Sequence, residues 1–207
     1  MNMIRTVWMA LLLQTMSVAT AAQPPAVGDV LRPLVIDNAG ILILDGEEVT
    51  HQAWSTASLS GRPVYLQHLA ARVGLDQTYQ AFSDALEARP YTPDDYQAVA
   101  VVNRDDAAFG TGFIVAQTLK SNKRRYPEAN IVVDNESKML EDWNLQPKSA
   151  AIMIVDAEGR VLFFKEGEMT EEESDSALAL LDAAITANQR AETGQSPTCT
   201  EGGALPC

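Results

Sequence analysis

The feature that most constrains the fold is a pair of apolar segments separated by one helix-length stretch. Residues 64–69 are typical of a buried strand, and residues 97–102 are typical of a second one. Between them, apolar residues recur at helical spacing at Leu75, Tyr79, Phe82 and Leu86, before Pro90 ends the helix. A strand, a crossover helix and a second strand predict two parallel neighbours joined by a right-handed connection. Both segments are apolar at successive positions, which fits a sheet covered on both faces.

The remaining segments predict a second unit, built from a hairpin and a helix. Residues 150–155 and 161–165 flank Asp156-Ala157-Glu158-Gly159, which is a hairpin signal. The last helix is expected to start at Thr170, with Glu173 placed for a capping box. Other expected elements are a hairpin of residues 33–36 and 41–44, a helix over 113–125, a strand over 130–133 and a helix over 137–143. This order predicts an α/β chain with a thioredoxin-like fold, in which a central mixed sheet is flanked by helices.

The two ends of the chain differ in composition from its centre. Residues 1–22 contain Arg5, a nearly all-apolar run over residues 7–13 and a small-x-small site at Ala19-Thr20-Ala21, which together predict a secretory signal peptide. That apolar run is too short for a membrane-spanning helix. Residues 188–207 are rich in Gly, Ser, Thr and Pro without apolar periodicity, which predicts a flexible tail. We therefore expect one domain over residues 23–187.

The formal net charge of the chain is −13. An acidic surface of this kind repels phosphate groups, so neither nucleic acid nor an anionic membrane is an expected partner. The charge does not identify a positively charged partner, because many exported proteins are acidic for solubility alone.

Several short motifs, in order along the chain, are similar to one known family. They are Leu66-Gln67-His68-Leu69-Ala70-Ala71-Arg72, Val102-Asn103-Arg104-Asp105-Asp106-Ala107, Gly110-Thr111-Gly112, Ser121-Asn122-Lys123, Tyr126-Pro127, Ile131-Val132-Val133-Asp134, Trp143-x-Leu145 and Ser149-Ala150. Across residues 31–187 the chain resembles the YtfJ family. The resemblance implies an exported, periplasmic, thioredoxin-like domain of a Gram-negative bacterium, and it implies no catalytic residue.

A thioredoxin-like scaffold usually supports a reactive C-x-x-C pair, and this chain has none. Such a site needs a low-pKa thiolate at a helix start with a resolving cysteine nearby, but the corresponding residues 70–76 contain no sulfur. The proline that usually precedes the next strand of the fold is also missing, because its position falls at Ala150. The two cysteines, Cys199 and Cys207, lie in the expected tail and predict a structural disulfide after export. Thiol oxidoreductase activity is not expected, and no cofactor is predicted.

Polar side chains gather where the two parallel strands are expected to end. His68 and Arg72 lie at the end of the first strand, and Asn103, Asp105 and Asp106 follow the second. The carboxyl ends of strands in an open α/β sheet face one crevice, which is the usual place for a ligand. These five residues are therefore the candidate crevice for a ligand or partner.

Two functions fit this candidate crevice. The first is a redox-inactive binding or interaction module for a periplasmic protein or small molecule whose identity the sequence does not give. The second is a non-redox enzyme, with His68 and either Asp105 or Asp106 as an acid–base pair or a metal site. A structural role is the third interpretation, with His68 packed in the core and the acids capping the helix after Gly110-Thr111-Gly112. A single histidine supplies too few ligands for a recognisable metal site, so no metal ligand is assigned.

Overall fold

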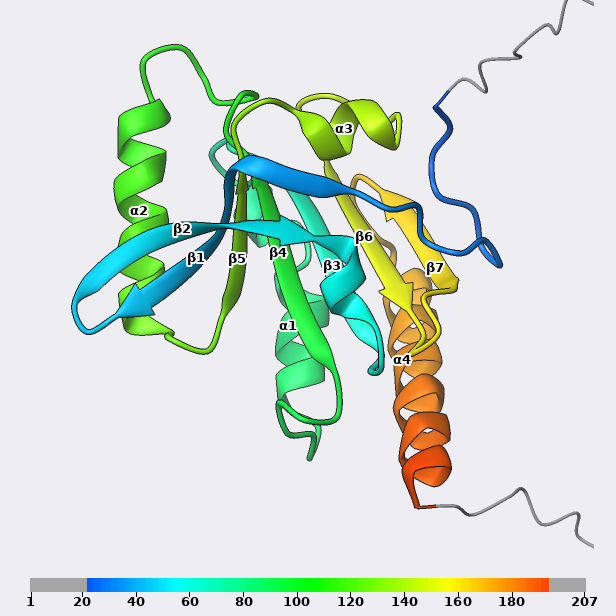
Figure 1. The fold of residues 1–207 in the computed structure, drawn as a ribbon. Helices are drawn as coiled ribbons and strands as arrows, with labels where there is room; N and C mark the ends of the chain where they lie inside the picture. The colour runs from blue at the N-terminus through cyan, green and yellow to red at the C-terminus, as the bar shows by residue number, and fades with distance from the viewer. Residues whose placement is uncertain (1–21, 194–207) are drawn as a thin grey trace, which may run out of the picture.

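The computed structural model describes residues 22–193, and these form a seven-stranded mixed sheet with helices against it (Figure 1). The strands are β1 Val35–Asp45, β2 Glu48–Ser55, β3 Val64–Ala70, β4 Gln97–Asn103, β5 Asn130–Asp134, β6 Ala150–Val155 and β7 Val161–Glu166. The α-helices are α1 Gln80–Glu87, α2 Gly112–Arg125, α3 Lys138–Asp142 and α4 Glu171–Glu192, and the 3-10 helices are η1 Thr56–Leu59 and η2 Leu75–Gln77. The expected signal peptide lies outside the described residues, apart from its last residue.

The order of strands across the sheet is β2-β1-β5-β4-β3-β6-β7. Strands β3 and β4 are parallel neighbours, as the apolar pattern predicts, and β5 continues the parallel set on the far side of β4. Strand β6 pairs antiparallel with β3, and β7 pairs antiparallel with β6. The predicted strand–helix–strand unit and the predicted hairpin–helix unit are therefore both confirmed.

The first hairpin differs from the prediction. The expected turn at residues 37–40 is a register shift inside one long strand, because the pairing of β1 with β2 jumps between Ile36 and Ile41. Gly40 lies in this irregularity with a φ of +79°, and a Cβ atom there would collide with the Gln52 carbonyl. The chain reverses at Gly46 instead, at a φ of +59°. Asp45-Gly46 is thus the true turn signal of this hairpin.

Helices α1 and α4 cover one face of the sheet, and residues from both join one hydrophobic core with alternate residues of β3 and β6. Its buried members include Tyr65, Phe82, Leu86, Ile152, Leu181 and Ile185. Helix α2 lies on the same side, above β1 and β5, where Leu119 meets Leu42 and Val133. The opposite face is covered by α3 and by the open end of the β1–β2 hairpin, which crosses in front of the sheet (Figure 1).

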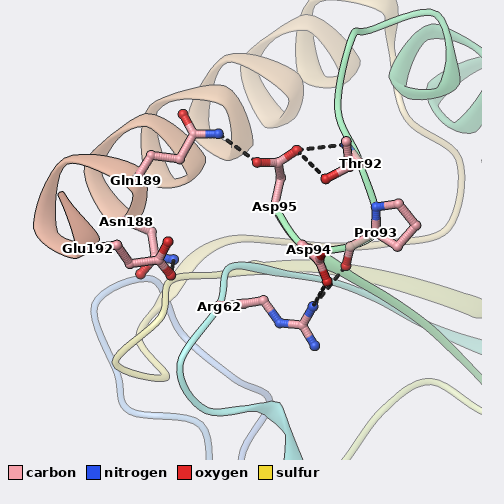
Figure 2. A network of polar contacts seen from close by, with 8 residues as sticks. All are labelled: Arg62, Thr92, Pro93, Asp94, Asp95, Asn188, Gln189 and Glu192. Carbon is pink, nitrogen blue, oxygen red and sulfur yellow. Dashed lines mark hydrogen bonds and ion pairs between the residues drawn. The ribbon is translucent and has the colours of Figure 1, made fainter.

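Helix α4 begins with the predicted capping box, in which Thr170 and Glu173 bond reciprocally. The helix ends later than expected, at Glu192, so the first five residues of the predicted tail are helical. Polar contacts hold this last part in place, as Figure 2 shows: the Gln189 side chain donates to Asp95 at 2.6 Å. Asp95 also accepts from the backbone and the hydroxyl of Thr92. These bonds fix the end of α4 to the connection between α1 and β4.

Candidate functional site

His68 lies in the central strand β3, between Val101 of β4 and Ala151 of β6. Only 1% of its surface is exposed, so His68 does not open into the predicted crevice and is packed in the core, as the structural interpretation expects. Its neighbours on the same face of the sheet are apolar, and burial lowers the pKa of His68 to about 4, although the charges of Asp134 and Asp106 act to raise it. The Nε2 atom is buried without a hydrogen-bond partner. A buried unpaired ring nitrogen is uncommon in folded proteins.

Asn103 ends strand β4 two residues beyond Val101, the partner of His68, and it is completely buried. Its Nδ2 donates to the hydroxyl of Ser137 at 3.1 Å, and its Oδ1 accepts from the backbone N–H of Asp105 at 3.1 Å. Asn103 is therefore also a buried residue and is not exposed in the predicted crevice. Its amide instead links the end of β4 to the loop that precedes α3.

Asp134 is a member of this cluster that sequence reasoning missed. It pairs with Asn103 in the register of β4 and β5 and is also fully buried. Its two carboxylate oxygens accept from the backbone N–H groups of Glu136 at 3.1 Å and Met139 at 2.9 Å. The signal was present in the sequence, because Asp134 directly follows the apolar residues 131–133, just as Asn103 directly follows the apolar residues 98–102.

Asp105 and Asp106 bond to neighbouring loops, and neither caps α2, whose N-terminus has no side-chain cap. The Ser137 hydroxyl donates to Asp105 Oδ2 at 3.0 Å. The backbone N–H of Lys148 donates to Asp106 Oδ2 at 2.9 Å. Asp105 is exposed and Asp106 is half-buried. The two acids therefore tie together the loops that follow β4 and β5 and the loop that precedes β6.

Two residues that donate these bonds, Ser137 and Lys148, have left-handed backbone conformations. Ser137 has a φ of +53° and Lys148 has a φ of +60°. This conformation is energetically unfavourable for residues other than glycine, and such positions are frequent at binding and catalytic sites. Both lie at the same edge of the sheet as the candidate crevice.

Arg72 lies apart from the acids, in the turn that follows β3. It is half-buried, its Nε is buried without a partner, and no ion pair joins it to Asp105 or Asp106. The next residue, Val73, is fully exposed, and Gly74 turns the chain at a φ of +89°. Of the five predicted crevice residues, the structure joins Asn103, Asp105 and Asp106 by hydrogen bonds. His68 is buried within β3, and Arg72 lies in the turn that follows this strand.

The described residues contain no cluster of three or more metal-binding side chains. Two surface hollows lie away from the predicted crevice. The larger, about 270 Å³, is lined by the β6–β7 turn and α4; the smaller, about 20 Å³, lies beneath α2. Within residues 22–193 no helix has the length and apolar character needed to cross a membrane.

The segment that would hold a redox pair is free of cysteine throughout. Residues 70–76 run from the last residue of β3 through a turn into η2, and the backbone N–H of Ala70 donates to the Ser149 carbonyl at 3.1 Å. Cys199 and Cys207 lie outside the described residues, and so does the disulfide predicted between them. The prediction of a thioredoxin-like fold without a cysteine pair at this place is confirmed.

Comparisons with known proteins agree with this architecture. A family model described as "Bacterial protein of unknown function (YtfJ_HI0045)" matches residues 26–184. The "Uncharacterized protein YtfJ" of Escherichia coli K12 is 34% identical over 154 residues, covering 74% of this chain and 84% of that protein. A protein of Haemophilus influenzae is 31% identical over 147 residues, covering 71% of this chain and 80% of its own length.

Solved structures show the same fold at low sequence identity. A "putative Thiol:disulfide interchange protein DsbE" from Chlorobium tepidum has a TM-score of 0.53 at 15% identity, with 78% of this chain and 99% of that chain covered. A thiol peroxidase from Chromobacterium violaceum has a TM-score of 0.50 at 14% identity, with 79% and 90% covered. At these identities the likeness shows the fold alone.

Proposed function

This chain belongs to the bacterial YtfJ_HI0045 family, and we propose that it is an exported periplasmic binding module whose site is the crevice at the carboxyl ends of β3 and β4. Export is supported by the signal-peptide pattern of residues 1–22. A binding function without redox chemistry is supported by the absence of cysteine from residues 70–76.

The observation that carries the proposal is that the arrangement around His68 lowers the stability of the fold. The buried Nε2 has no partner, and the two left-handed residues Ser137 and Lys148 lie in the surrounding loops. An unpaired buried polar atom and strained backbone both lower stability, so a fold retains them most readily where they serve a ligand or partner. At the same edge of the sheet, the exposed Asp105 and the half-buried Arg72 are available to contact a ligand or partner.

The proposal is tested by affinity capture from periplasmic extract, followed by mass spectrometry of proteins, small molecules and metals. Arg72→Ala removes a crevice cation, and Arg62→Ala is the matched control, because Arg62 is also half-buried but lies at the opposite end of β3. We expect the captured species to be lost with Arg72→Ala and kept with Arg62→Ala. Equal capture by both variants, or none by the unmodified protein, would contradict the proposal.

A non-redox enzyme is the second candidate, and the unpaired Nε2 of His68 is the observation that favours it. With a pKa of about 4 the imidazole is neutral at pH 7, so it could act as a general base but not, as an imidazolium, as a general acid. Asp106 and Asp134 already accept hydrogen bonds from backbone N–H groups, so fewer of their carboxylate oxygens are available to exchange a proton with His68. Turnover of a captured small molecule, lost on His68→Gln in a folded protein, would favour the enzyme over the module.

A further inference from the structure

Four large apolar side chains are exposed at the edge of the sheet that holds the crevice. Val73 and Phe109 are fully exposed, and Phe113 and Ile114 expose 72% and 64% of their surface. Val73 follows β3, and the other three lie in the loop after β4 and the first turn of α2. Single exposed apolar residues are normal, but a group of this kind on one edge is typical of an interaction site.

The outward face of α2 continues from these residues without an acidic side chain. The exposed positions after Ile114 are uncharged until Arg124 and Arg125, at the last turn of the helix. No Asp or Glu occurs between Asp106 and Glu128, in a chain that has 28 acids and 15 Lys and Arg residues in all. We define the α2 surface as Phe109, Phe113, Ile114, Arg124 and Arg125. It is apolar at one end and basic at the other.

The electrostatic environment of a neighbouring histidine agrees with this polarity. His51 of β2 lines the small hollow under α2 together with Arg104 and Lys120. Burial and the charges of Lys120 and Arg104 all lower the pKa of His51. A positive region on an otherwise acidic protein favours a negatively charged partner.

We propose that the α2 surface binds an acidic polypeptide segment, whose apolar anchor residues contact Phe109, Phe113 and Ile114 and whose carboxylates face Arg124 and Arg125. The inference rests on the proposed function and deepens it, because the α2 surface borders the crevice and specifies the class of partner. Helix α2 has 14 residues and is therefore about 21 Å long, a span that suits a peptide segment rather than a small molecule.

The test is selection from a displayed library of random linear peptides, followed by affinity measurement on the full chain. We expect the selected peptides to combine Asp or Glu with aromatic or aliphatic residues, and their affinity to fall as salt is raised. The double variant Phe109→Ser and Phe113→Ser should weaken binding at least about tenfold, because a few buried apolar anchors dominate such interfaces. Arg125→Glu should weaken it as well.

The matched control is the double variant Val27→Ser and Val30→Ser, which changes two residues exposed by 68% and 58% away from the α2 surface. It should bind the selected peptides as the unmodified chain does. All four substitutions are at exposed positions, so the variants should fold, and circular dichroism verifies this.

Several outcomes would overturn the inference. They are selected peptides without acids, binding unchanged by the phenylalanine substitutions, self-association in sedimentation that these substitutions abolish, and association with phosphatidylglycerol vesicles through the same residues. The proposed function has a separate readout, since capture that is sensitive to Arg72→Ala but not to the phenylalanine substitutions would retain the crevice and reject the α2 surface. If capture is sensitive neither to Arg72→Ala nor to the phenylalanine substitutions, both the crevice and the α2 surface are rejected.

Discussion

Lowering the pH from 7 towards 4 is expected to destabilise this domain through His68. In the unfolded chain the imidazole takes up a proton around pH 6.5, whereas in the fold burial lowers its pKa to about 4. Above pH 6.5 the ring is neutral in both states and contributes no pH dependence. As the pH falls below 6.5 the unfolded state binds a proton that the folded state excludes, so the free energy of unfolding decreases. The decrease levels off below pH 4, where both states are protonated.

The size of this effect follows from the two pKa values. Each pH unit between 6.5 and about 4 costs about 1.36 kcal/mol of stability, which gives about 3 kcal/mol in all. That is a large share of the roughly 5–15 kcal/mol that stabilises a typical domain. Because only 1% of His68 is exposed, solvent screening reduces the figure little.

The assay is urea denaturation from pH 7.5 to pH 4, comparing the unmodified chain with His68→Leu. The variant removes the titrating ring from its apolar surroundings, so its stability should depend less on pH by about 3 kcal/mol over this range. His51→Gln is the matched control, because the chain has two histidines and His51 is exposed. Its pH dependence should stay close to that of the unmodified chain.

A direct measurement would refute the reasoning most clearly. With two histidines in the chain, NMR titration can follow each imidazole separately. If both rings titrate near pH 6.5, or if His68→Leu keeps the full pH dependence, then the burial of His68 does not govern acid stability. The NMR result holds even if the leucine variant fails to fold.

Three further predictions concern the acids, the hairpin and the missing redox site. Asp106→Ala should lower the free energy of unfolding by about 1 kcal/mol in urea denaturation, because the Lys148 N–H loses its partner, while the exposed Asp105→Ala should cost less. Equal costs would show that these bonds do not distinguish the two acids. Gly40→Ala should cost at least about 2 kcal/mol by thermal denaturation, since the new side chain would be strained at φ +79° and would meet the paired strand; an unchanged melting temperature would argue against the bulge. Insulin reduction and peroxide turnover should both equal the buffer control, and activity abolished by Cys199→Ser would contradict this.

Much of the fold could be predicted because its signals are local. The apolar run of β3, the helical spacing before Leu86 and the capping box of α4 each depend on residues close together in sequence. The first hairpin was mispredicted because two glycine-containing segments, 37–40 and 45–46, both resemble turns. Only the pairing with β2 decides which of them reverses the chain, and that pairing is not a local property.

The candidate site was predicted only in part because burial depends on distant segments. The sequence places His68 and Asn103 at the ends of strands, but it does not show that both are buried or that Ser137, just before α3, bonds to Asn103. The contribution of Asp134 requires knowing that β5 adds to the parallel set beside β4. Asp105 is exposed and Arg72 is half-buried, which agrees better with the expectation that these residues line a crevice.

The position of α4 at the end of the described chain has a consequence for biogenesis. Tyr65 in β3 and Ile152 in β6 share a core with Leu181 and Ile185 of α4. A chain under synthesis therefore leaves the part of this face that α4 covers exposed until the last helix has emerged. A product that stops before α4 would display this apolar face to chaperones and proteases, so quality control can distinguish the complete domain from a truncated one by whether α4 is present.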